Sequence, residues 1–237
     1  MSPTDFVAEL KKSGKRRRAV NDQRYLKSDR EFLGVTVPVI RKLAAPIATE
    51  FKKSGNLTPA LRYARALWQT EIHEPRTSAI LIVAECEPIF DDRVWKLGWA
   101  WLGQIDNWGH CDGIAGYMLA PLVKTAVHKH KSRRREMLRK TTDPNPWVRR
   151  GALVSMIPSI RTDKESEFIL NLAARAIRDD DYFVQKGLGW ALRECAHHNP
   201  REVISFIQTH RERMRRSTIT NALSRLPKTL QKAAREG

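Results

Sequence analysis

One segment of about ten residues recurs along the chain at intervals of 36 residues. The copies are HEPRTSAILI from His73, GHCDGIAGYM from Gly109, NPWVRRGALV from Asn145 and DYFVQKGLGW from Asp181. The seventh position is small in every copy, as Ala79, Ala115, Gly151 and Gly187. A fixed period of this length is typical of stacked helix pairs, in which a small residue lets neighbouring helices approach closely. A weaker fifth copy begins at Val37, with Leu43 at the small position.

Turn residues between the copies predict where helices begin and end. Thr36 is a suitable N-cap and Gly55 a suitable stop, while Thr58 and Asn199 each precede a proline. No alternating strand pattern and no Asn-Gly hairpin occurs. We therefore expect an all-α chain, folded as an α-solenoid whose aligned helices line a concave surface.

The expected solenoid is a single domain, residues 1–237, with repeat copies near residues 37, 73, 109, 145 and 181. The alternative is that the copies reflect chance and ordinary helix spacing, because identity between them is low. The register holds through four copies without a gap, which favours the repeat.

The charge balance indicates the class of partner. The formal net charge is +17 and the isoelectric point about 10.2, which favours nucleic acid first and an anionic membrane surface second. Basic runs at 128–140 and 211–216 agree. No apolar run is long enough to span a bilayer, and the beginning of the chain lacks the apolar core of a signal peptide. Three cysteines without disulfide spacing favour a reducing cytoplasm, or the nucleoid if the source is bacterial.

The aligned segments also carry residues that do not fit a core. Lys186, Trp190, Arg193 and His197 follow 4-3-4 spacing and share one helix face, while Arg149 and Arg150 follow Trp147 in the preceding copy. Cations interleaved with aromatic rings suit phosphates, sugars and base faces. The alternative is that Trp190 packs in the core and the cations extend from its edges. The four tryptophans expected in the core are Trp68, Trp95, Trp99 and Trp101.

Trp108 and Asp112 lie four residues apart, so they share a helix face. A carboxylate in a groove for a polyanion repels its ligand, which suggests a specific role. Asp112 could pair with a neighbouring arginine. It could instead stabilise the positive charge that develops at C1′ when an N-glycosidic bond breaks, or orient a water toward that carbon. Indole faces favour the same cation. A purine alkylated at N3 or N7 suits this chemistry, because it leaves as a neutral base.

Three segments, DNWGHCD, NPWVRRGAL and FVQKGLGWALRECAHHNP, resemble the AlkD-type DNA alkylation-repair glycosylases, which are built of HEAT-like repeats. The resemblance runs from RYLKSDREFLGV to NPREVISFI. It implies a right-handed solenoid with a concave basic face. It also implies hydrolysis of N3- and N7-alkylpurine glycosidic bonds in duplex DNA, without metal or cofactor and without base flipping.

The resemblance also implies residue roles. Asp112 matches the catalytic aspartate, Trp108 and Trp190 match two indoles that contact the sugar, and Arg150 and Arg193 match residues that hold the DNA backbone. Tyr25 matches a further aromatic of the cleft. Arg149, Lys186 and His197 are added as DNA contacts from their place on the aligned helices. Gly109 and Gly113 depart from good helix sequence, so either DNA approaches closely there or the helix begins late.

Other functions remain open at this stage. The same scaffold could bind damaged or branched DNA, or RNA, without catalysis, or could serve as a protein adaptor. His110, Cys111 and Asp112, like Cys195, His197 and His198, lack the spacing of a structural zinc site, so no metal is expected. We expect a monomer with no obligate protein partner and no membrane, acting on double-stranded DNA with alkylated bases.

Overall fold

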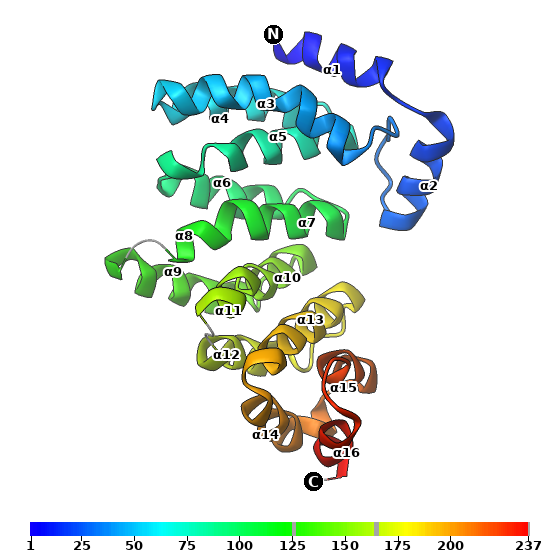
Figure 1. The fold of residues 1–237 in the computed structure, drawn as a ribbon, viewed down its shortest axis with the longest axis vertical. Coiled ribbons are helices and arrows are strands. Elements are labelled where there is room, and N and C mark those ends of the chain that lie inside the picture. The colour runs from blue at the N-terminus through cyan, green and yellow to red at the C-terminus, as the bar shows by residue number, and fades with distance from the viewer. Residues whose placement is uncertain (125–126, 164–165, 237) are drawn as a thin grey trace. The chain divides into compact units, whose positions relative to one another are not determined.

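The computed structural model describes residues 1–124, 127–163 and 166–236 (Figure 1), with the side chains of 124–130, 162, 163 and 236 left out. Within that part the chain is helical and forms no strand beyond an isolated bridge between Glu31 and Ile72. The all-α prediction is thus confirmed. The chain forms two compact units, Met1–Met118 and Leu119–Gly237. The single domain, the right-handed solenoid path and the concave basic face stay predictions.

The first unit is built of paired helices around α5. Its helices are α1 (Pro3–Lys12), α2 (Arg16–Leu26), α3 (Val37–Ser54), α4 (Leu57–Trp68), α5 (His73–Glu85), α6 (Asp92–Leu102) and α7 (Trp108–Ile114). A 3₁₀ turn, Glu87–Ile89, follows α5, and a π-helical turn, Ala115–Leu119, follows α7. Helix α5 packs against α3, α4 and α7.

The second unit is built around α13, which packs against α10, α12, α14 and α15. Its helices are α8 (Ala120–Lys124), α9 (Val127–Lys140), α10 (Pro146–Val154), α11 (Ile157–Asp163), α12 (Ser166–Ala176), α13 (Tyr182–His198), α14 (Pro200–His210), α15 (Arg216–Leu223) and α16 (Lys228–Glu236). A 3₁₀ turn, Arg211–Arg213, follows α14.

The helix starts follow the repeat register. Helices α5, α7, α10 and α13 each begin within one residue of the predicted copies, and the small residues at the seventh positions are buried. A Cβ atom added to Gly187 would lie 3.2 Å from Cγ of Arg150 in α10, so a small residue is needed at that crossing. In α3 the small buried residues are Ala44 and Ala48, while Leu43 is half-buried. Helix α3 begins at Val37, where the weaker fifth copy begins, but its seventh position, Leu43, is not small.

Side-chain caps define the N-terminal ends of three of the aligned helices. Asn107, Asn145 and Asp181 each accept a backbone N–H in the first turn of the following helix, at 3.0, 2.9 and 2.8 Å. Thr58 is not a cap, because α4 begins earlier and is capped by Asn56, whose Oδ1 accepts from Thr58 N at 3.0 Å. The predicted helix start at Thr36 is correct, although its hydroxyl makes no capping bond.

The core contains the four tryptophans that were assigned to it. Trp68, Trp95, Trp99 and Trp101 are all buried, and Trp68 stacks on Trp101 with ring centroids 4.1 Å apart. Among the described residues, no helix has both the length and the apolar character needed to cross a bilayer.

Candidate nucleic-acid interface

Helix α7 presents two different faces. His110, Cys111 and Ile114 are buried, whereas Trp108 and Asp112 are half-buried and lie one turn apart on the opposite side. The spacing therefore predicted their shared face correctly. Tyr25, at the end of α2, is 71% exposed and meets the Trp108 ring edge to face at 5.4 Å. The structure thus brings two of the predicted aromatic residues together beside the carboxylate helix.

Of the two glycines of α7, Gly109 lies at a close approach between helices, whereas a Cβ atom at Gly113 would make only an ordinary contact. The helix begins at Trp108, so the alternative of a late start is wrong, and the alternative of close DNA approach stays a prediction. A Cβ atom at Gly109 would lie 3.2 Å from Cδ2 of Leu26, so glycine lets α2 approach α7. At Gly113 the nearest atom would be Cγ2 of Ile80, at 3.5 Å. Each glycine weakens the helix by about 1 kcal/mol relative to alanine. A short helix of this composition depends on its surroundings for its position.

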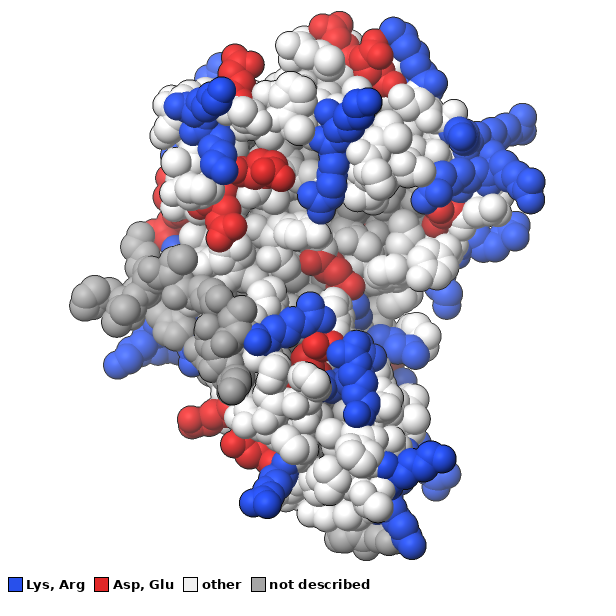
Figure 2. All heavy atoms as spheres, viewed as in Figure 1, with Lys and Arg blue, Asp and Glu red and all other residues white. Residues whose placement is uncertain are grey.

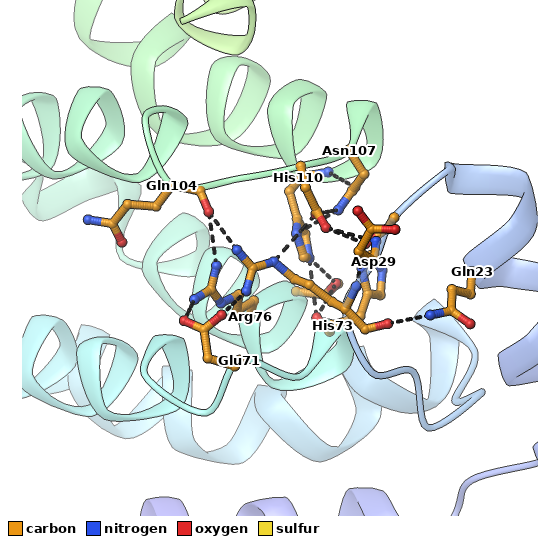
Figure 3. Close-up of polar contacts among 12 residues, drawn as sticks. Gln23, Asp29, Glu71, His73, Arg76, Gln104, Asn107 and His110 are labelled. Atoms are coloured by element: carbon orange, nitrogen blue, oxygen red, sulfur yellow. Dashed lines mark hydrogen bonds and ion pairs between the residues drawn. The ribbon is translucent and has the colours of Figure 1, made fainter.

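A buried polar network holds the start of α7 (Figure 3). Asp106 Oδ2 accepts from Ser28 Oγ at 2.8 Å and from the backbone N of Asp29 at 3.2 Å. Asn107 Nδ2 donates to Asp106 Oδ1 at 3.0 Å and lies 3.2 Å from His110 Nδ1. Burial alone would raise the pKa of Asp106, but the hydrogen bonds from Ser28 and Asn107 keep it below its ordinary value. The network ties α7 to the segment that follows α2.

Two imidazoles stack inside this network. The rings of His73 and His110 lie 4.2 Å apart, and Phe32 stacks on the other face of His73 at 4.1 Å. Burial is the main cause that lowers the pKa of His73 to about 4; Asp106 opposes the change, and Arg30 adds to it. Burial, and after it the neighbouring His73, holds the pKa of His110 well below its ordinary value. Both rings are therefore neutral at pH 7.

Charged side chains complete the buried layer around the histidines. Arg76 is buried and donates to the backbone O of Trp68 at 2.9 Å, and its guanidinium pairs with Glu71, which also pairs with Arg30. The Glu74 carboxylate is buried and accepts three backbone N–H groups of the loop after α2, from Leu33, Gly34 and Val35, at 2.9, 2.6 and 3.2 Å. The roles of Arg76, Glu71 and Glu74 were not predicted. Glu74 binds a loop about 40 residues away, and Arg76 binds a backbone oxygen at the end of α4 and a loop carboxylate that no motif marks.

The predicted stripe on α13 lies at the surface of the second unit. Lys186 and His197 are exposed, and Trp190 and Arg193 are half-buried. The Trp190 indole is half-buried, and its Nε1 donates to Glu194 Oε1 at 3.1 Å. The Lys186 ammonium lies 5.5 Å from the centre of the Tyr182 ring. Cations and one indole thus alternate along a single helix face.

Glu194 organises the inner side of this stripe. Its carboxylate accepts from Arg161 Nε at 2.9 Å and from Arg225 Nη1 at 3.2 Å. Burial alone would raise the pKa of Glu194, but the hydrogen bond and charge of Arg161 keep it below its ordinary value. Arg193 donates to Asn221 Oδ1 at 2.7 Å. Its buried Nε has no hydrogen-bond partner within the described residues.

The two adjacent arginines of α10 have protein partners. Arg149 donates Nε and Nη2 to the Asp179 carboxylate at 2.6 and 3.1 Å, and Nη1 to the backbone O atoms of Asp143 and Pro144. Arg150 is only 5% exposed, and its Nη1 donates to the backbone O of Phe183 at 2.7 Å. These contacts give both arginines a packing role between α10 and its neighbours. DNA binding by either arginine stays a prediction.

Helix α2 carries the densest basic surface of the first unit. None of its residues is buried, and Figure 2 shows Lys and Arg side chains gathered over it. They are Lys15, Arg16, Arg17, Arg18, Arg24 and Lys27. Of the predicted basic run at 128–140, the side chains up to residue 130 lie outside the described residues. No group of three or more His, Cys, Asp or Glu side chains suited to a metal ion occurs in the described part of the chain.

Comparison with known proteins gives consistent results. The sequence model of the DNA alkylation repair enzyme family matches residues 6–226. A predicted DNA alkylation repair enzyme from Enterococcus faecalis has a similar structure, with a TM-score of 0.79 and 18% identity over 91% of this chain and 98% of that one. Among curated proteins, none matches the sequence.

Two structures from Streptococcus mutans are also similar. Smu.31, from strain UA159, has a TM-score of 0.54 and 15% identity, covering 83% of this chain and 98% of its own. AlkD2 has a TM-score of 0.57 and 14% identity, covering 78% and 98%. At these identities the likeness shows a shared fold.

Proposed function

The chain belongs to the DNA alkylation repair enzyme family, and from this premise we propose that it is a DNA glycosylase. The proposed reaction is hydrolysis of the N-glycosidic bond of N3- or N7-alkylated purines in duplex DNA. The observation that carries the proposal is the outer face of α7, where Trp108 and Asp112 lie one turn apart and Tyr25 packs against the indole. The family supports the role in alkylation repair, and we assign cleavage of the bond to this face.

The chemistry follows from the charge of the damaged base. Alkylation at N3 or N7 makes the purine cationic, so when the C1′–N bond breaks the base takes the electron pair and leaves neutral. Positive charge then develops at C1′ of the deoxyribose. We assign Asp112 to stabilise that charge and to accept a proton from the water that adds to C1′. The indole of Trp108 favours the same cation through its electron-rich face.

The α13 stripe is proposed to bind duplex DNA as well. Lys186 and His197, both exposed, suit phosphate contacts, and Trp190 offers a half-buried indole for a sugar. Arg193 is proposed to act at the backbone. We further propose that the protein acts as a monomer in the cytoplasm, without a cofactor and without extruding the damaged base.

The test is release of 7-methylguanine and 3-methyladenine from methylated duplex DNA. Asp112→Asn keeps the shape of the side chain and removes its charge, so we expect base release to fall by on the order of 100-fold or more. DNA affinity should be unchanged or slightly tighter, since one repulsive charge is lost. Asp180→Asn is the matched control, because it makes the same charge change at a fully exposed carboxylate.

Two results would count against the proposal. Equal rates for Asp112→Asn and wild type would remove Asp112 from the mechanism. Tight, salt-sensitive binding by wild type without any base release would favour a non-catalytic binder of damaged or branched DNA.

A further inference from the structure

Helix α7 cannot fix its own direction. It spans Trp108–Ile114, contains Gly109 and Gly113, and runs directly into the π-helical turn Ala115–Leu119. Helices this short are marginal in isolation, and glycine weakens them further. The direction in which Trp108 and Asp112 point must therefore be set by contacts on the buried face of the helix.

The hydrogen bonds on that buried face determine where each proton lies. The backbone N–H of His110 can only donate, and it lies 3.0 Å from Asn107 Oδ1, so the orientation of the Asn107 amide is fixed. Nδ2 of the same amide then donates to Asp106 Oδ1 at 3.0 Å and to His110 Nδ1 at 3.2 Å. His110 Nδ1 must consequently be an acceptor and carry no proton.

The proton of a neutral His110 ring is therefore on Nε2. That atom lies 3.0 Å from Thr77 Oγ1 and 3.2 Å from the backbone O of His73, both in α5. The Thr77 hydroxyl donates to the same His73 oxygen at 3.1 Å, which leaves its oxygen as an acceptor. An imidazolium at this position would place an N–H of the ring against an N–H of Asn107. The network is complete only with a neutral ring.

We propose that Asn107 and His110 are positioning residues for Asp112. The neutral Nε2–H ring of His110, held between the Asn107 amide and α5, fixes the first turn of α7 and so directs the opposite face outward. The inference rests on the proposed function, because the direction of Asp112 matters to catalysis only if Asp112 acts on DNA. The titratable and charged groups around the ring are Arg30, His73, Arg76 and Asp106.

The first test measures the ring directly and is independent of activity. Two-bond ¹H–¹⁵N correlation spectra of the histidine rings, recorded on the full chain from about pH 7 to about pH 5, report tautomer and charge. We expect His110 to remain the neutral Nε2–H tautomer throughout. An Nδ1–H tautomer, or an imidazolium in the folded protein at these pH values, would overturn the assignment.

The second test changes the network and keeps the cap. Asn107→Asp retains an N-cap oxygen, but its second carboxylate oxygen faces Asp106 Oδ1 and the His110 ring. We expect the ring to become protonated at Nδ1, the pH profile of base release to shift, and the single-turnover rate to fall about tenfold or more, since small misplacements of a catalytic group cost this much. DNA affinity should be retained.

A matched variant separates positioning from capping. Asn145→Asp makes the same change at the N-cap of α10 and should leave the single-turnover rate unchanged.

If Asn107→Asp does not fold, Thr77→Val removes one acceptor of His110 Nε2 with little change of shape and should lower the rate severalfold. A folded Asn107→Asp, or otherwise Thr77→Val, with the wild-type rate would overturn the positioning role. If wild type releases no base, the proposed function fails, and the ring tautomer still decides whether Asn107 and His110 hold α7 as described.

Discussion

Acid should destabilise the first unit well before its carboxylates titrate. His73 has an ordinary pKa of 6.5 and a folded-state pKa of about 4. As the pH falls below 6.5, the unfolded chain takes up a proton at this ring and the folded chain does not. The unfolded state therefore binds more protons between pH 6.5 and about pH 4, and the free energy of unfolding falls across that range.

The size of the effect follows from the two pKa values of His73. The linkage relation gives a loss of about 2 kcal/mol between about pH 7 and about pH 5 from this ring. His110 acts in the same direction, because its pKa is also lowered. The carboxylates with lowered pKa values, which are Asp5, Asp91, Asp106 and Glu194, lose their contribution mainly below about pH 5, so this range isolates the histidines.

Urea denaturation at about pH 7 and about pH 5, at constant ionic strength, measures the difference. Tryptophan fluorescence reports mainly on the first unit, which holds all but Trp147 and Trp190. His73→Phe keeps a flat ring beside Phe32, and His73 Nδ1 has no hydrogen-bond partner within the described residues. This variant should remove about 2 kcal/mol of the acid-induced loss. The exposed His197→Phe should keep the wild-type loss, and an equal loss in His73→Phe would refute the reasoning.

Two further predictions concern buried charge and DNA contacts. Glu74→Gln turns an amide N–H₂ toward the backbone N–H groups from which the carboxylate accepts hydrogen bonds. The free energy of unfolding, measured by urea denaturation, should therefore fall by about 2–3 kcal/mol. Glu85→Gln, at an exposed position, is the control, and equal stability of the two variants would contradict the buried role of Glu74. Lys186→Ala should reduce the salt dependence of DNA binding by about one unit of slope. Arg149→Ala should instead lower the melting temperature, because it breaks the Asp179 pair. The reverse pattern would show that Arg149 is the DNA contact.

The positions of the aligned helices could be predicted because their signals are local. A small residue seven positions into each copy depends on the sequence of a single helix and its immediate neighbour. The same reasoning placed Trp108 and Asp112 on one face, since helical periodicity alone decides which side chains align. The weak copy at Val37 shows the limit, because its seventh position, Leu43, is not small and so gives no signal of close packing.

The partners of the charged residues could not be predicted in the same way. Arg149 and Arg150 are adjacent and chemically identical, but one pairs with Asp179, 30 residues away, and the other is buried against Gly187. Which contact each makes depends on how α10 meets other helices, and no local pattern encodes that. The histidine network is a similar case, because His73 and His110 belong to different copies and meet only when α5 and α7 pack.

Helix α2 has no buried residue, so its sequence is constrained differently from that of a helix in the core. Substitutions along α2 remove few apolar contacts, so a mutational scan scored by melting temperature would register little there apart from Leu26, which lies against Gly109. The same scan scored by retention on an anionic matrix would register its arginines strongly. We therefore expect substitutions of the α2 arginines to affect the binding of an anionic ligand more than the stability of the fold.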